Sequence, residues 1–165
     1  MRRVLLLLSV AAALVPLGAA AGAGARQQAT VLMAEDANAR KGQEEWGYAD
    51  AIVAGDTIYL SGVVAGQREG ETLEQAYERA YQRIGKVLER AGASWDDVVD
   101  ITSFHTDVVA QMPVIVAVQK RYIKAPVPAW TAIDVDRLIP DRGITEIKIV
   151  AHRAARAPER RARTR

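Results

Sequence analysis

Few side chains in this chain could carry chemistry, and their spacing limits what that chemistry can be. The chain has no cysteine and two histidines, His105 and His152, which lie far apart. Neither histidine has further histidines or acidic residues grouped around it, so we expect no metal site. Gly62 and Gly66 open into a polar stretch rather than a helix, so they do not form a phosphate-binding loop. We therefore expect His105 to be a structural residue of a strand and no cofactor to be bound.

Three stretches of the sequence follow one family pattern in the same order. They are GYADAIVAGDTIYLSG (47–62), ETLEQAYERAYQRIGKVLERAGASWDDVVDITSF (71–104) and VPAWTAIDVDRLIPDRGITEIKIVAHR (127–153). Together they resemble the Rid family (YjgF/RidA), whose members include enamine/imine deaminases. The resemblance starts near Tyr48 and ends near Arg153.

The resemblance implies an α+β fold of the chorismate-mutase-like type, a homotrimer, and ligand pockets between the subunits. It also implies roles for individual residues. Glu146 matches the family glutamate that positions the attacking water in imine hydrolysis. Tyr48 and Ser61 match groups that line the pocket, and Arg137 matches a basic residue common in the family.

Trp130 departs from the family pattern. The family has Pro-Ala-Arg where this chain has Pro128-Ala129-Trp130, and that arginine grips the substrate carboxylate. An indole offers one neutral N–H, whereas a guanidinium offers five donors and a fixed positive charge. A charge-assisted bond worth about 1.5–3 kcal/mol is therefore missing.

Alternatives remain for these positions. Trp130 either packs in a core or interface, or lines an altered pocket that stacks an aromatic or apolar ligand. Arg137 or Arg142, both in the following loop, could hold a carboxylate from another direction. Glu146 could instead face solvent, because residues 145–149 alternate between polar and apolar side chains.

Hydrophobic periodicity predicts the elements that position these residues. We expect a β-hairpin from segments 46–53 and 57–63, strands at 98–106, 129–135 and 143–151, and helices at 72–91 and 110–123. Thr72 and Gln75 fit a capping box at the start of the first helix, and Gly92 fits its end. Pro113 is expected in the first turn of the second helix. The order ββαβαββ predicts two helices on one face of a mixed sheet.

The ends of the chain differ in composition from this domain. Residues 1–25 combine Arg2 and Arg3, an apolar run, and a small-residue cleavage site, which is typical of a secretory signal peptide. The apolar run is shorter than the roughly 20 residues of a membrane span. We interpret 26–45 as a leader without a clear period, 46–153 as the Rid-like domain, and 154–165 as a basic disordered tail.

Charge and composition favour a small-molecule ligand. Without Arg2, Arg3 and the segment from Arg153 onward, the chain has 14 basic and 19 acidic residues. An acidic domain is a poor partner for nucleic acid, which needs clustered Lys and Arg. The sequence therefore predicts a secreted or periplasmic protein that binds a metabolite, with weak or absent 2-imino acid deaminase activity and no stable membrane anchor. The alternative is an active deaminase in which Glu146 positions water.

Overall fold

The computed structural model describes residues 24–153. The predicted tail 154–165 and residues 1–23 of the predicted signal peptide lie outside the described residues. Within the described part, no helix has the length and apolar character needed to cross a membrane.

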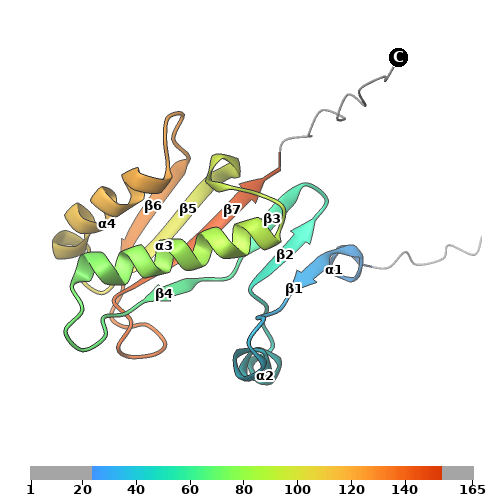
Figure 1. Cartoon of the computed structure of the whole chain (residues 1–165), viewed down its shortest axis with the longest axis horizontal. Helices are drawn as coiled ribbons and strands as arrows, with labels where there is room; N and C mark the ends of the chain where they lie inside the picture. Colours follow the sequence, from blue (N-terminus) through green and yellow to red (C-terminus); the bar gives the residue numbers. More distant parts are fainter. Residues whose placement is uncertain (1–23, 154–165) are drawn as a thin grey trace, which may run out of the picture.

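A mixed sheet forms the centre of the molecule (Figure 1). Its strands are β1 (Thr30–Leu32), β2 (Ala51–Ala54), β3 (Thr57–Leu60), β4 (Val63–Ala65), β5 (Val98–His105), β6 (Ala129–Asp134) and β7 (Thr145–His152). The spatial order is β1-β2-β3-β7-β5-β6, and the short β4 also pairs with β7. β5 and β6 run parallel, and the other pairs are antiparallel.

Two long helices, α3 (Leu73–Arg90) and α4 (Val108–Tyr122), pack side by side over one face of this sheet (Figure 1). The chain order β2, β3, β4, α3, β5, α4, β6, β7 is the predicted ββαβαββ arrangement with the short β4 added, and it confirms the α+β class. Alternate residues of β7 point toward the helices and are fully buried, namely Thr145, Ile147, Ile149 and Ala151. The intervening residues of β7 therefore lie on the face that the helices leave open.

The helix α3 follows its predicted boundaries and its predicted apolar stripe. The amide of Gln75 donates to Thr72 Oγ1 at 3.2 Å, and the amide of Thr72 donates to Gln75 Oε1 at 2.8 Å. The helix buries seven residues that recur at helical spacing: Ala76, Tyr77, Ala80, Tyr81, Ile84, Val87 and Leu88. Gly92 follows with a φ of 75°, the left-handed conformation that the sequence predicts at this helix end.

The helix α4 begins earlier than predicted. Asp107 accepts a hydrogen bond from the amide of Ala110 at 3.0 Å and so caps a helix that starts at Val108. Pro113 consequently lies beyond the first turn, which corrects the predicted position. Because proline has no N–H, the helix lacks one backbone hydrogen bond at this point.

The segment 26–45 contains elements that periodicity did not indicate. It contains most of α1 (Ala25–Gln28), the edge strand β1, and most of α2 (Ala37–Trp46). Asp36 caps α2 by accepting from the amide of Ala39 at 2.8 Å, and Gly47 ends it with a φ of 72°. The stretches here are too short to show a reliable period, since β1 has three residues.

Candidate functional site

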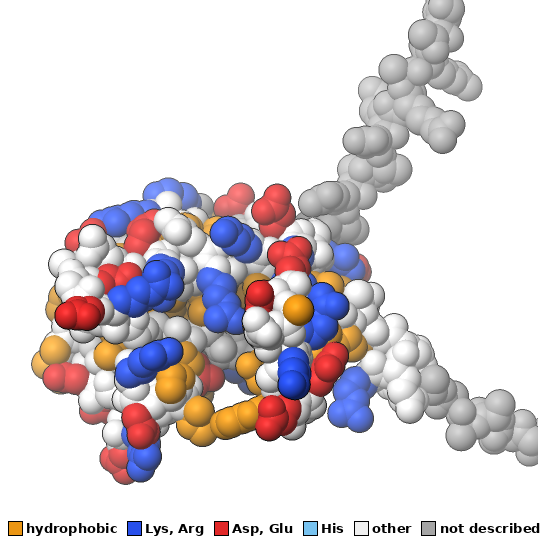
Figure 2. All heavy atoms as spheres, turned by 60° about the horizontal axis from the view of Figure 1, so that its bottom comes forward, with side chains coloured by type: hydrophobic (Ala, Val, Ile, Leu, Met, Phe, Trp, Pro, Cys, Tyr) orange, Lys and Arg blue, Asp and Glu red, His pale blue; other side chains and the backbone are white. Residues whose placement is uncertain are grey.

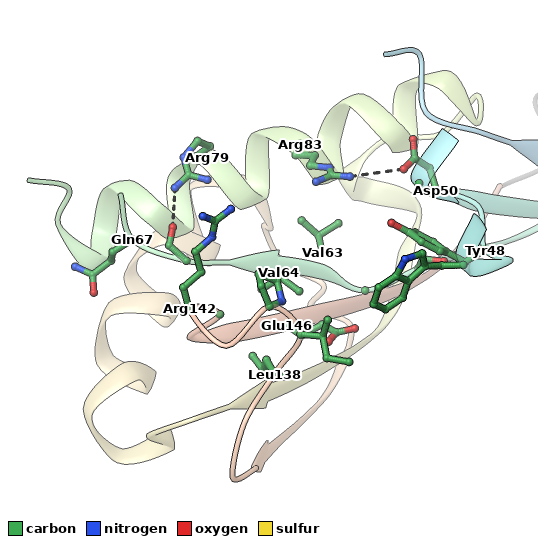
Figure 3. Close-up of a pocket in the computed structure, with 18 of the residues that line it drawn as sticks. Tyr48, Asp50, Val63, Val64, Gln67, Arg79, Arg83, Leu138, Arg142 and Glu146 are labelled. Atoms are coloured by element: carbon green, nitrogen blue, oxygen red, sulfur yellow. Dashed lines mark hydrogen bonds and ion pairs between the residues drawn. The ribbon is translucent and has the colours of Figure 1, made fainter. Parts of the chain in front are cut away.

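A cavity of about 1240 Å³ opens along the short strand β4 (Figure 3). Its walls come from α3, from the end of α2 and the residues after it, and from the loop between β6 and β7. Four of the residues that the sequence predicts for the site line this cavity: Tyr48, Ser61, Arg137 and Glu146. The fifth, Trp130, does not line it.

Glu146 is the second residue of β7, at a point where β7 pairs with two other strands. Its register partners are Val64 of β4 and Phe104 of β5. The side chain is half-buried, and it lies on the sheet face opposite the helices because Thr145 and Ile147 point toward them. Among residues 24–153 the carboxylate has no hydrogen-bond or ion-pair partner, so it remains available to a ligand or a water molecule.

Gly62 makes room for the Glu146 carboxylate. A Cβ atom added at residue 62 would lie 1.8 Å from Glu146 Oε1. The carboxylate is therefore packed directly over the backbone at the point where β3 turns into β4. Any side chain at residue 62 would force the carboxylate out of this position.

Tyr48 and Ser61 approach the cavity from two adjoining backbone segments. The amide of Tyr48 donates to the carbonyl of Gln43, and the amide of Ser61 donates to the carbonyl of Asp50 at 2.9 Å. Tyr48 is 50% exposed. Trp46, which is also exposed, lines the same end of the cavity. Two aromatic side chains and a hydroxyl thus flank the region of Glu146.

Asp50 contacts several polar side chains at the edge of the cavity. Its Oδ2 accepts from Arg90 Nη1 at 3.0 Å, and its Oδ1 accepts from Gln43 Nε2 at 2.7 Å. Arg83 of α3 lies 3.7 Å from Oδ1, beyond hydrogen-bond distance (Figure 3). Asp50 is therefore satisfied by Arg90 and Gln43, and its link to Arg83 is a long ion pair.

Several arginines line the cavity, and their guanidinium groups differ in their hydrogen-bond and ion-pair partners. Arg79 donates to both Glu71 oxygens and to the carbonyl of Gly66. Arg79 and the backbone amide of Arg68 hold the pKa of Glu71 below its usual range. Arg137 forms an exposed pair with Asp141 at 2.9 Å.

Trp130 faces the helices rather than the cavity. It lies on the edge strand β6 opposite Ile101 of β5, and its ring packs against the hydrophobic core. Its Nε1–H donates to Ser103 Oγ at 2.9 Å. Within one chain, Trp130 and Glu146 therefore lie on opposite faces of the sheet.

The Ser103 hydroxyl belongs to a buried polar network centred on His105. The two ring nitrogens of His105 lie 2.8 Å from Ser103 Oγ and 3.1 Å from Gln111 Oε1. Because Gln111 Oε1 can only accept, Nδ1 carries the proton and Nε2 accepts from Ser103. Thr145 Oγ1 donates to Gln111 Oε1 at 3.1 Å and lies 2.7 Å from the hydroxyl of Tyr77.

Burial sets the ionisation of this network. Desolvation lowers the pKa of His105, and the hydrogen bond to Gln111 opposes that shift. Burial also raises the pKa of Tyr77 to about 12. His105 is thus a neutral, fully enclosed imidazole, in line with its predicted structural role. Across residues 24–153, no three His, Asp or Glu side chains are grouped so that they could hold a metal ion.

Several cavity residues were not predicted from the sequence. Arg83 and Asp50 come from different elements, and only the fold shows that they meet. A signal existed for Arg83, because Arg79 and Arg83 follow each other at a spacing of one helical turn, along one edge of the apolar stripe of α3. Trp46 lies in the segment that the sequence pattern predicts as the start of a hairpin. In the structure it is instead the last residue of α2.

Known proteins are similar to this chain in sequence and in fold. The RutC family protein YjgH of Escherichia coli (strain K12) is 38% identical over 110 residues, which cover 63% of this chain and 81% of the relative. The 2-iminobutanoate/2-iminopropanoate deaminase of Dermatophagoides farinae is 29% identical over 108 residues, which cover 62% of this chain and 83% of that protein.

A YjgF/YER057c/UK114 family structure from Mycobacterium tuberculosis superposes with a TM-score of 0.66 at 22% identity, covering 76% of this chain and 99% of its own. This likeness confirms the predicted fold class. The family model described as Endoribonuclease L-PSP matches residues 40–153, which is most of the chain and most of the described residues 24–153. The chain therefore belongs to the Endoribonuclease L-PSP family, the YjgF/RidA family that the sequence pattern indicated.

Proposed function

We propose that this protein is an exported, homotrimeric Rid protein that binds a small metabolite around Glu146, with weak or absent 2-imino acid deaminase activity. The observation that carries the proposal is the engagement of Trp130. Its N–H, the only donor of the indole, already donates to Ser103. Nothing at the family's arginine position is therefore left to hold a substrate carboxylate.

The chemistry of imine hydrolysis explains why this loss matters. Water attacks the imine carbon while a base accepts a proton from it, and the C–N bond then breaks to release ammonia and a 2-oxo acid. Glu146 has a free carboxylate that can accept this proton. Without a cation at the clamp, a short imino acid is not held in position over Glu146. A lost bond of about 1.5–3 kcal/mol corresponds to about a 10- to 150-fold loss of binding.

An active deaminase is the second candidate. It is favoured by the shared cavity, in which Glu146, Tyr48 and Ser61 all face the same space. One of the relatives is named as a 2-iminobutanoate/2-iminopropanoate deaminase. In this alternative another group holds the substrate, and Glu146 positions the water.

A turnover assay separates the two candidates. The substrates 2-iminobutanoate and 2-iminopropanoate are generated enzymatically, and their decay is followed with the wild type, Glu146→Ala and Trp130→Arg. We expect wild-type decay close to the uncatalysed rate, and an increase of about tenfold or more in Trp130→Arg, which restores a guanidinium. Fast wild-type decay that disappears in Glu146→Ala would establish the deaminase instead.

Gly62→Ala provides a second way to disturb Glu146 without removing it. The added methyl group would occupy the place of the carboxylate, which can swing away because it ends a flexible side chain. If the wild type or Trp130→Arg is active, Gly62→Ala should lower that activity while the protein stays folded. Unchanged activity would show that the observed position of Glu146 is not the productive one.

Cell fractionation tests the proposed export. The basic and apolar residues at the start of the chain support a signal peptide with cleavage near Ala25. We expect the protein in the periplasmic or secreted fraction, with an N-terminus near Arg26. A cytoplasmic protein that retains its first residues would contradict this part of the proposal.

RNA cleavage, which the name of the family model suggests, has less support. Figure 2 shows Lys and Arg side chains intermingled with Asp and Glu side chains over the face in view, instead of forming a basic patch. Binding to a phosphate backbone depends on clustered positive charge. A small organic ligand fits the mixed charge and the cavity better.

A further inference from the structure

We infer that the cavity holds a carboxylate group of its ligand on the α3 side, between Arg83 and Arg142. This inference rests on the proposed small-molecule function and extends it. It names a ligand class, an organic acid with an apolar body, and it names two residues that provide the cation missing at Trp130. Neither residue occupies the family's clamp position.

Arg142 is available for a ligand. It lies in the loop between β6 and β7 and lines the cavity, and its side chain is exposed. Figure 3 shows the side chain rising from this loop toward α3. Among residues 24–153 its guanidinium has neither a hydrogen bond nor an ion pair. A guanidinium left without an anion beside a cavity is suited to bidentate binding of a carboxylate.

Arg83 is the second available guanidinium. It projects from α3 into the same cavity, and its side chain is 61% exposed. Among residues 24–153 its only ion-pair partner is Asp50 at 3.7 Å, and both oxygens of Asp50 already accept from Arg90 and Gln43. Arg83 can therefore turn to a ligand without leaving a buried carboxylate unpaired.

The other two arginines with side-chain partners in the cavity are less suited to this role. Arg79 is fixed by Glu71 and by the carbonyl of Gly66, and Arg137 is paired with Asp141. A ligand anion would have to compete with those carboxylates. Arg68 also lines the cavity, and its charge acts on Glu71, whose pKa it helps to lower. We therefore place the carboxylate between Arg83 and Arg142.

The walls of the cavity define the rest of the ligand. Apolar side chains also line the cavity, among them Val63, Val64, Val87 and Leu138. The volume of about 1240 Å³ lies at or above the upper end of ordinary ligand pockets. A ligand that fills such a space is longer than a short imino acid. The negative charge of Glu146 repels an acid group, so the carboxylate end is directed to the arginines.

Calorimetric titration with named probes tests this site. The probes are 2-oxooctanoate, its neutral methyl ester, and the short acid 2-oxobutanoate. We expect 2-oxooctanoate to bind most tightly. Arg83→Leu and Arg142→Leu should each weaken its binding by about 10- to 100-fold, as expected for the loss of a charge-assisted bond. The ester should bind the wild type about as weakly as the acid binds the double variant.

Matched variants control for charge and folding. Lys86→Leu removes a positive charge from α3 outside the cavity, and it should leave binding within about twofold of the wild type. Arg83→Leu and Arg142→Leu should keep the wild-type melting temperature, because neither exposed side chain makes a structural hydrogen bond. Arg137→Leu should cost less than Arg142→Leu, since Asp141 already engages its guanidinium.

Three results would overturn the inference: no binding of 2-oxooctanoate by the wild type, unchanged binding in the Arg83→Leu, Arg142→Leu double variant, or a larger loss in Arg137→Leu than in Arg142→Leu. The imine decay assay is a separate measurement. A fast wild-type deaminase would contradict the proposed weak activity and leave the arginine site standing. Loss of the arginine site would leave the turnover result unchanged.

Discussion

Trp130 uses its single hydrogen-bond donor within the protein, so the indole has no donor left for a ligand. The indole N–H is held by Ser103, whose own hydroxyl donates to Nε2 of His105. The tryptophan thus does more than leave position 130 without a charge. It joins the edge strand β6 to a buried polar network, so the side chain contributes to packing and to hydrogen bonding at once.

His105 makes the stability of the protein depend on pH. Burial lowers its folded-state pKa below the usual 6.5, so the unfolded chain binds a proton more readily than the folded one. The His105 contribution is therefore fully present above about pH 6.5 and is lost as pH falls below it, by at most about 1.4 kcal/mol per pH unit. Chemical denaturation between pH 8 and pH 5 measures this loss.

The second histidine of the chain provides the matched control. His152 lies at the end of β7 with an exposed side chain. His105→Gln should be less stable than the wild type at pH 8, because it disturbs the network, but its stability should fall less steeply as the pH drops. His152→Gln should follow the wild-type profile. A wild-type slope in His105→Gln would show that other groups cause the pH dependence.

Helices and strands that are long enough to repeat their hydrophobic pattern several times could be predicted, and short ones could not. The stripe of α3 extends over five turns, so its boundaries and buried face were evident from spacing alone. By contrast, β1 and β4 have three residues each, and their pairing partners lie far away in the sequence. Such strands exist because a neighbour offers unpaired backbone groups, which local sequence does not report.

The residues of the candidate site also fall into those that could be predicted from the sequence and those that could not. Tyr48, Ser61 and Glu146 could be assigned because they occupy positions in a family pattern. The arginines of the α3 wall could not, because an arginine such as Arg83 at the edge of an apolar stripe is ordinarily a solvated residue. Its proximity to Asp50 and to the loop of Arg142 depends on how α3 lies over the sheet.

An aromatic cluster ties α3 to α4 and to the short 3₁₀ helix η1 (Trp95–Asp97). The rings of Tyr81, Trp95 and Tyr122 have centroids 5.3–5.4 Å apart. Gly85 allows the approach, because a Cβ atom there would lie 3.2 Å from Trp95 Nε1. Trp95→Ala should lower the free energy of unfolding by about 2–4 kcal/mol in chemical denaturation.

Trp46→Ala is the control for this prediction. Trp46 is 66% exposed and takes no part in the cluster, so its removal should change stability by less than about 0.5 kcal/mol. Equal destabilisation by the two variants would show that the cluster does not join the helices. The difference between them isolates the contribution of ring packing between elements.

At the scale of the whole molecule, the sheet face opposite the helices exposes apolar side chains. Sheet register places Val31, Ile52, Tyr59 and Val150 in one row across this face, and Phe104 and Ile133 in another row beside Glu146. Tyr59 is 49% exposed and Ile133 is 43% exposed. A sheet face of this kind is stable in water when another surface covers it.

Self-association on this face would also bring Trp130 of one chain close to Glu146 of another. The two residues lie on opposite faces of one sheet, whereas the family resemblance places both at one pocket between subunits. Packing the open face of one chain against the edge strand of the next would place a second chain's β6 beside Glu146. We therefore expect a homotrimer in which each pocket takes residues from two chains.

Light scattering after size-exclusion chromatography tests this arrangement through mass. The wild type should have three times the mass of a single chain. Ile133→Asp introduces a charge into the open face and should shift the protein toward monomers, because burying an unpaired carboxylate is costly. Val109→Asp is the control, since Val109 is 83% exposed at the start of α4, on the helix-covered side. If Ile133→Asp remains trimeric while Val109→Asp dissociates, the helices form the contact surface and the pocket must be complete within one chain.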